Sequence, residues 1–281
     1  MFGIIEVEGG EAVKRIKDWE ELTIQDNFLF LKVMQNKRLC QHLIEKILQI
    51  KIVEITYPDT EKSIDVRWDS KSVRLDVYVK DETGRVYDIE MQCENEANNG
   101  LAKRTRYYQG MIDMELLNKG DVYDNLKPSY IIFICTFDAF AKGRPMYTFR
   151  NRCVEEQGLE LNDEATKIFL NSKGDSETLD PDVRAFLRYV DGKAAEGSFM
   201  KAVEDEVMRV KEHKETRREY MTYAMEIKRR ELAKFKEGRE EERSSIILNM
   251  LKDGVAKEII AKYVRVSVEY VTELGKKNHL L

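Results

Sequence analysis

The stretch that decides the fold is residues 73–92, which read VRLDVYVKDETGRVYDIEMQ. Two β-rich runs flank the segment 81–85, whose Asp, Thr and Gly are typical of a turn, so the stretch predicts a β-hairpin. With 81–85 as the loop, counting outward places Asp76 directly opposite Glu90. Side chains alternate along a strand with a period of two, which puts Gln92 on the same face as Glu90. One face of the hairpin is therefore predicted to present Asp76, Glu90 and Gln92.

Facing carboxylates on neighbouring strands repel each other unless a proton or a cation lies between them. A hard divalent metal ion resolves this conflict, because Mg²⁺ accepts one or two carboxylates together with water and phosphate oxygens. Such an ion can lower the pKa of a water that attacks a phosphodiester. The alternative is that Asp76 and Glu90 are ordinary solvent-facing residues of a half-exposed hairpin. The spacing by itself does not exclude that interpretation.

Helices and further strands surround the hairpin in the sequence. Apolar residues at three- and four-residue steps predict helices over 23–49 and 101–119, with a break near Asn36 and an end at Gly120. The nearly unbroken apolar run 130–136 predicts a strand buried on both faces. Shorter strands are expected over 51–57, 146–150 and 167–171, and another helix over 182–190. This order predicts an α/β fold with a mixed central β-sheet flanked by helices.

The sparse cysteines and histidines exclude several chemistries. The four cysteines are far apart and form no C-x-x-C pair, so neither a disulfide framework nor a zinc knuckle is expected. None of the three histidines lies near another candidate ligand or nucleophile, which argues against zinc hydrolysis and Ser/His or Cys/His catalysis. Catalysis would therefore depend on carboxylates. Without an apolar run of about eighteen residues or a signal-like start, the chain is expected to be soluble and cytoplasmic, with no membrane partner.

Charge divides the chain into three parts. Residues 198–243 contain 13 Lys/Arg and 12 Asp/Glu around an intermittent apolar stripe, which predicts a charged amphipathic helical arm. Residues 244–281 read as three short helices, with Ser267 as an N-cap, so the C-terminal extension is expected to be all-helical. Residues 1–197 carry 28 Lys/Arg against 36 Asp/Glu, so DNA binding there would require local basic patches or a metal ion. The expected domains are 1–195, 196–243 and 244–281.

The terminal helices have two interpretations. Their order suits a helix-turn-helix DNA reader with 267–277 as the recognition helix. Few basic residues lie on that segment, however, and it also contains Glu269 and Glu273. Homo-oligomerisation through the C-terminal helices is the alternative, and the balanced charge of the preceding arm favours self-association over a DNA clamp.

Motifs along the chain together resemble the PD-(D/E)-x-K nuclease superfamily and, within it, the recombination-promoting nuclease and putative transposase family of bacteria. The resemblance covers roughly residues 22–190. Its motifs are LTIQDNF (22–28), RLDV (74–77), YDIEMQ (87–92), RYYQ (106–109) and GDVY (120–123), the last leading into the apolar strand. The resemblance implies a restriction-endonuclease-like core. It also implies an Mg²⁺-dependent DNA endonuclease, with Mn²⁺ as the alternative ion, linked to recombination or mobile elements.

The resemblance also implies which residues form the site. Asp76 and Glu90 would bind the metal ion, together with the main-chain carbonyl of Met91, and Gln92 stands where the superfamily has lysine. Gln92 can orient a water but lacks the positive charge of lysine, so modest activity or a stronger metal dependence is expected. Asp26 is a candidate fourth catalytic acid. Alternatively, its carboxylate satisfies backbone donors at the start of the first helix.

The helix after the hairpin contains the candidate DNA-binding residues Lys103, Arg104, Arg106 and Gln109. Arg106 and Gln109 are three residues apart, so they share a helix face that could reach a phosphate. The alternative is an ordinary solvated helix start. The competing function for the whole chain is a catalytically weak or inactive DNA-binding or assembly protein that retains the nuclease fold. The replacement of lysine by Gln92 is the main reason to consider it.

Overall fold

The computed structural model describes residues 4–6, 12–58, 63–64, 73–95, 100–175 and 177–281. Contacts within the chain divide it into two units, and each is described by itself. One unit is Trp19–Thr216, and the other combines Met1–Asp18 with Arg217–Leu281.

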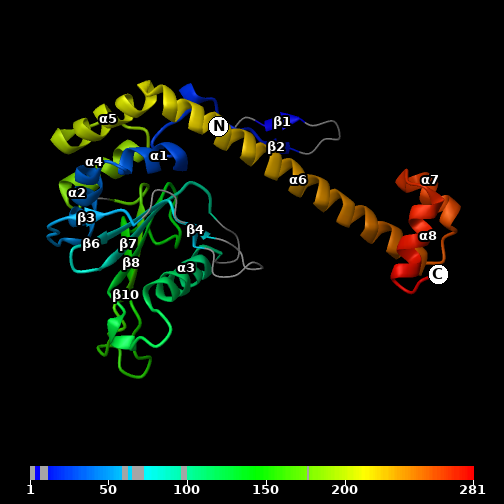
Figure 1. Ribbon diagram of the computed structural model, residues 1–281, viewed down its shortest axis with the longest axis horizontal. Helices are drawn as coiled ribbons and strands as arrows, with labels where there is room; N and C mark the ends of the chain where they lie inside the picture. Colours follow the sequence, from blue (N-terminus) through cyan, green and yellow to red (C-terminus); the bar gives the residue numbers. More distant parts are fainter. Residues whose placement is uncertain (1–3, 7–11, 59–62, 65–72, 96–99, 176) are drawn as a thin grey trace. The chain divides into compact units, whose positions relative to one another are not determined.

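The unit Trp19–Thr216 is built around a mixed sheet, which within the described residues has six strands in the order β3-β6-β7-β8-β10-β9 (Figure 1). Strands β6 and β7 form an antiparallel hairpin, β7, β8 and β10 run parallel, and β3 and β9 are antiparallel edge strands. The strands are β3 (Ile55–Thr56), β6 (Val77–Asp81), β7 (Val86–Gln92), β8 (Ser129–Cys135), β9 (Met146–Phe149) and β10 (Ala165–Asn171). The predicted α/β fold with a mixed sheet is confirmed.

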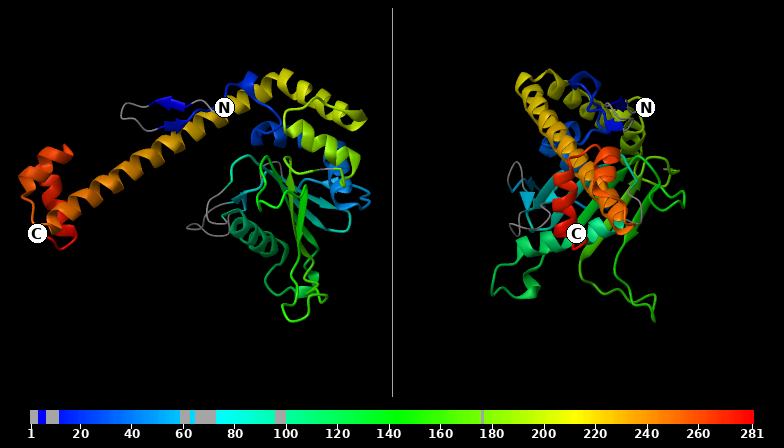
Figure 2. Two further views of the ribbon diagram at one scale, coloured as in Figure 1. Left: turned by 180° about the vertical axis from the view of Figure 1, so that it is seen from behind. Right: turned by 90° about the vertical axis from the view of Figure 1, so that its right-hand side faces the viewer.

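Helices cover both faces of this sheet (Figure 2). Helix α3 (Gly100–Leu116) connects the parallel strands β7 and β8 and covers one face. On the opposite side, α1 (Asn27–Met34) and α2 (Lys37–Leu48) pack against the sheet, and α4 (Pro181–Val190) and α5 (Gly197–Glu212) pack on these helices. The predicted break near Asn36 is confirmed, because its side chain caps α2 by accepting a hydrogen bond from the Leu39 N–H at 3.4 Å. Short 3-10 helices are η1 (Trp19–Glu21) and η3 (Tyr123–Asn125).

The hairpin formed by β6 and β7 has the predicted register, because Lys80 lies opposite Val86. Its first arm is shorter than expected. The residues before β6 form β5 (Val73–Arg74), which pairs with β4 (Ser63–Ile64) in a separate two-stranded sheet. The cause is a bend in the backbone at Asp76, which interrupts the strand that the alternating pattern predicts over 73–79. This bend places Asp76 just ahead of the ladder between β6 and β7.

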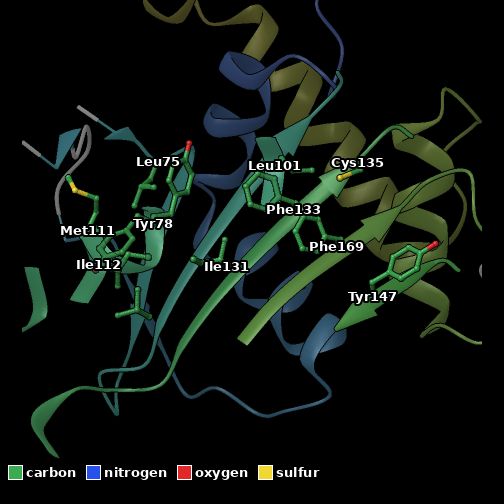
Figure 3. Packing of buried hydrophobic residues seen from close by; sticks show 12 residues of the cluster. Leu75, Tyr78, Leu101, Met111, Ile112, Ile131, Phe133, Cys135, Tyr147 and Phe169 are labelled. Carbon is green, nitrogen blue, oxygen red and sulfur yellow. The ribbon is translucent and has the colours of Figure 1, made fainter. Parts of the chain in front are cut away.

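A mixed aromatic and aliphatic core fills the space between α3 and the sheet (Figure 3). Phe133 on β8 is fully buried, and its ring stacks on Phe169 at a centroid separation of 5.4 Å and on Tyr108 of α3 at 6.3 Å. Strand β8 is buried on both faces over most of its length, as its apolar run predicts. Because Glu90 lies opposite Phe133 in the register of β7 and β8, this core holds α3 directly beside the acidic residues.

The other unit contains most of α6 (Lys214–Lys252) and all of α7 (Lys257–Val264), α8 (Val268–Lys277), β1 (Ile4–Glu6) and β2 (Ala12–Lys14). Its C-terminal helices share a core of Ile247, Leu251, Ile260, Ala261 and Val271. Ser267 caps α8 as predicted, with its hydroxyl accepting the Tyr270 N–H at 3.1 Å. The first short helix expected after residue 244 is instead the end of α6, because no proline interrupts the chain there. In the part of the chain that is described, no helix combines the length and apolar character needed to cross a membrane.

Candidate active site

The carboxylates of Asp76 and Glu90 meet where β6 begins beside β7. The Asp76 N–H donates to Glu90 Oε1 at 2.8 Å, and the Met91 N–H donates to Asp76 Oδ2 at 3.1 Å. Each acid is thus tied to the backbone of the opposite strand, which keeps the two side chains together. Glu90 is buried, with 3% of its surface exposed, whereas Asp76 is half-buried. One deep acid and one more accessible acid therefore share the site.

A third acid, Asp88, lies on the same face of β7 as Glu90, and the hairpin motif does not single it out. Its side chain is fully buried. Among the described residues, neither carboxylate oxygen of Asp88 has a hydrogen-bond donor, and Glu90 can hydrogen bond with it only when the two share a proton. The period-two relation of positions 88, 90 and 92 is the signal that could have identified it. A buried carboxylate without a donor requires a proton or a cation beside it.

The electrostatics of this cluster favour added positive charge. Burial raises the pKa of both Asp88 and Glu90 well above the usual values, and the negative charge of Asp76 raises them further. The charge of Asp88 raises the pKa of Glu90 as well, while Arg104 acts in the opposite direction on both acids. A cation bound among the three acids would offset these shifts, because positive charge favours the ionised carboxylates.

Asp88→Asn is expected to stabilise the metal-free protein at neutral pH. Because burial and Asp76 raise the folded-state pKa of Asp88 above its unfolded-state value, folding takes up a proton. The loss of folding stability caused by the Asp88 carboxyl therefore begins as pH rises above about 4. It grows until the pH passes the folded-state pKa. One pKa unit corresponds to about 1.4 kcal/mol, so in EDTA at pH 7 the Tm should rise by roughly 3 °C or more. Thermal melting followed by circular dichroism would measure this gain, which should fade towards pH 4.

The matched control is Asp81→Asn. Burial acts to raise the pKa of Asp81, but hydrogen bonds from Thr83, Tyr87 and Arg85 outweigh it and hold the pKa below its usual value. Loss of that charge should lower the Tm at pH 7. If Asp88→Asn behaved like this control, the claim that the Asp88 carboxylate lacks donors would be contradicted.

Gln92 contacts a basic residue of α3. Its Oε1 accepts a hydrogen bond from Arg104 Nη2 at 2.7 Å, and its Nε2 donates to the Glu94 carbonyl at 2.5 Å. The same Arg104 nitrogen lies 3.8 Å from Glu90 Oε2. Arg104, a candidate DNA-binding residue from the sequence, is therefore half-buried beside the acidic cluster.

The start of α1 also reaches the site. Asn27, the first residue of α1, donates from Nδ2 to Asp76 Oδ2 at 3.1 Å. The neighbouring Asp26 holds the turn before the helix, because its Oδ2 accepts the Thr23 N–H at 2.8 Å and the Thr23 hydroxyl at 3.2 Å. No sequence periodicity indicates the Asn27 contact, since it depends on how α1 packs against β7.

The other DNA-binding candidates lie at different places on α3. Lys103 and Arg106 are exposed. Gln109 is half-buried, and its Nε2 donates to Asp113 Oδ1 at 2.8 Å and to Ser129 Oγ at 2.7 Å. Ser129 begins β8 opposite Val86, whereas Gln92 lies opposite Cys135 at the other end of that strand. The structure therefore gathers Asp76, Asp88, Glu90, Gln92, Arg104 and Asn27 at one place and leaves Gln109 apart from them.

The donor set suits a hard divalent cation. Asp76, Asp88 and Glu90 offer carboxylate oxygens, and those of Asp88 are the buried polar atoms that most need positive charge. Among the residues with a described placement, no group of three or more His, Cys, Asp or Glu side chains is arranged to hold a metal ion. Mg²⁺ does not require three such ligands, because it binds through one or two carboxylates and keeps several waters. The residues therefore fit this ion.

Comparisons with known proteins bear on the same region. Searches of curated proteins and of solved structures give no significant match. A family model described as PD-(D/E)XK nuclease family transposase matches residues 27–220, a range that contains the acidic cluster, Gln92 and α3. This match confirms the resemblance drawn from the sequence motifs. Because it covers well over half of the chain, the protein belongs to the PD-(D/E)XK nuclease family transposases.

Proposed function

We propose that this chain is a divalent-metal-dependent DNA endonuclease that hydrolyses phosphodiester bonds in recombination or in the movement of mobile elements. The observation that carries the proposal is the cluster of Asp76, Asp88 and Glu90, in which two buried acids lie beside a third and Arg104 offsets only part of their negative charge. Strongly perturbed carboxylates of this kind are characteristic of functional sites. Family membership supports a nuclease or mobile-element role.

Asp76 and Glu90 are the proposed protein ligands of Mg²⁺, or of Mn²⁺ as the alternative ion, and the Met91 carbonyl is a further ligand. When bound, the ion would polarise the scissile phosphate and lower the pKa of the attacking water. Asn27 orients the Asp76 carboxylate through its hydrogen bond, as outer residues commonly do at metal sites. These side chains would therefore fix the reacting groups in place before DNA arrives.

Gln92 and Asp26 complete the proposed catalytic set in supporting roles. Gln92 lies beside Glu90 and orders its polar neighbours by donating and accepting hydrogen bonds. Asp26 anchors the turn from which Asn27 extends towards the site. Neither residue adds positive charge, so the proposed activity is modest.

Exposed basic residues on α3 are the proposed DNA contacts. Lys103 and Arg106 lie on the surface of the helix that covers the acidic face, where they can pair with backbone phosphates. Arg104 lies deeper, where it would meet a phosphate only at the cleavage position. Gln109 would bind DNA only after releasing Ser129 and Asp113.

Nicking of supercoiled plasmid DNA tests this proposal. The wild-type protein is expected to convert supercoiled plasmid to open-circular DNA in Mg²⁺ or Mn²⁺, and EDTA is expected to abolish the conversion. Because Gln92 is neutral, the rate should be modest even at saturating metal. Retention of DNA that weakens with salt, without any nicking, would instead indicate a DNA-binding or assembly protein that keeps the nuclease fold.

A further inference from the structure

The neutral side chain at position 92 has a charged neighbour from another element. Arg104 extends from the first turns of α3 and places Nη2 2.7 Å from Gln92 Oε1 and 3.8 Å from Glu90 Oε2. Only 24% of the Arg104 side chain is exposed, and 5% of the Glu90 side chain. A fixed positive charge therefore stands beside a metal-ligand candidate in a poorly solvated place, where charge interactions are strong.

Two aromatic rings fix the guanidinium of Arg104. Its central carbon lies 4.8 Å from the ring centroid of Phe133 and 5.5 Å from that of Tyr108. These rings belong to the core between α3 and the sheet, so Arg104 is held by the fold rather than by surface contacts. A basic residue meant only to follow a mobile DNA backbone would not need such a support.

The orientation of the Gln92 amide follows from its two partners. Arginine can only donate, so it requires the amide oxygen, and the Glu94 carbonyl can only accept, so it requires the amide nitrogen. Both requirements are met by one orientation. Gln92 is therefore suited to hold Arg104, and a lysine at the same position would repel it.

We propose that Arg104 supplies from α3 the positive charge that lysine at position 92 would supply from β7, and that Gln92 is the positioning residue for Arg104. This inference rests on the proposed nuclease function and changes the expected consequence of the motif: the cation is relocated, not lost. It predicts that positions 92 and 104 depend on each other. One cation at either position is favourable, whereas two or none is not.

A double-mutant cycle tests that dependence at saturating plasmid and metal. Arg104→Met should lower the nicking rate about 10²-fold, the effect of removing one preorganised charge stabiliser. Gln92→Lys should also lower it, because the two cations repel. The double variant Gln92→Lys/Arg104→Met should recover at least about 10-fold over Arg104→Met alone. Wild-type nicking by Arg104→Met, or a double variant no better than Arg104→Met, would overturn the inference.

Metal affinity without DNA gives a second readout that does not depend on turnover. A +1 charge beside Glu90 opposes a divalent cation, so Arg104→Met should bind Mn²⁺ about 3- to 10-fold more tightly by calorimetric titration. A variant whose site had merely loosened would bind Mn²⁺ more weakly and also nick more slowly. Tighter Mn²⁺ binding together with slower nicking therefore points to the lost charge. Unchanged or weaker Mn²⁺ binding by the folded variant would contradict the placement of this charge.

Matched variants separate charge from packing. Arg104→Lys keeps the charge without the forked geometry and should fall between wild type and Arg104→Met. Arg152→Met removes an exposed, ion-paired arginine after β9 and should leave nicking unchanged. If the wild type nicks and Arg104→Met equals it, only this inference fails. If the wild type does not nick in any metal, the proposed function fails, and Mn²⁺ affinity alone decides whether Arg104 acts on the site.

Discussion

Glu90→Gln and Asp76→Asn should each lower plasmid nicking at least about 10³-fold, the largest effect expected on activity. Each change removes a charged metal ligand, which should cost more than the roughly 10²–10³-fold loss seen when one hydrogen-bond donor to a transition state is removed. The shape of the site should survive. Gln at position 90 retains an oxygen that can accept the Asp76 N–H, and Asn at position 76 can accept the Met91 N–H. The measurement is the initial nicking rate at saturating Mg²⁺.

The control for these variants is Glu160→Gln. Glu160 pairs with Arg152 at 2.8 Å near the edge strand β9, which β8 and β10 separate from β7. Its neutralisation should leave the nicking rate unchanged, since a partly exposed ion pair contributes little. Equal rates for wild type, Glu90→Gln and Asp76→Asn would show that the acidic cluster is not the catalytic centre.

Phe133→Ala should produce the largest loss of stability, about 3–5 kcal/mol in the free energy of unfolding. Phe133 has no exposed surface and stacks on rings of both β10 and α3, so truncation opens a cavity between the sheet and the helix. For a unit of this size the Tm should fall by roughly 10 °C. Thermal melting and urea unfolding of the purified variant would measure the loss.

Two variants make the Phe133 result specific. Phe133→Leu keeps most of the buried volume and should cost only about 1–2 kcal/mol. Tyr123→Ala removes a larger side chain whose surface is 84% exposed, and it should change stability by no more than about 0.5 kcal/mol. A Phe133→Ala protein as stable as the wild type would mean that α3 is not held against the sheet by this core.

The Phe133 variants also bear on the site. Because the Phe133 ring supports the Arg104 guanidinium, Phe133→Leu weakens that support while leaving most of the core in place. A loss of activity in this variant would therefore be interpreted together with the Arg104 series. The core and the acidic cluster lie side by side on the same face of the sheet, since Glu90 lies opposite Phe133.

Local patterns in the sequence were sufficient to predict the strands and helices that form the site. The turn over 81–85 sets the register of β6 and β7, because loop length and side-chain alternation determine which residues face one another. The apolar run 130–136 similarly identified β8 within one residue at each end. The same alternation places Asp88 on the face that carries Glu90. A carboxylate on a strand is usually exposed to solvent, however, and only the structure shows that Asp88 is buried.

Only the tertiary structure decided which residues join the acidic pair. Asn27 reaches Asp76 and Arg104 reaches Gln92 because α1 and α3 pack on opposite faces of the sheet and bring their first residues to one site. Those contacts span 49 and 12 residues of sequence and follow no helical or strand periodicity. The sequence by itself thus determined the fold class and the facing acids. Long-range packing determined that the buried Asp88 joins Asp76 and Glu90. It also determined that the guanidinium of Arg104 lies beside Gln92.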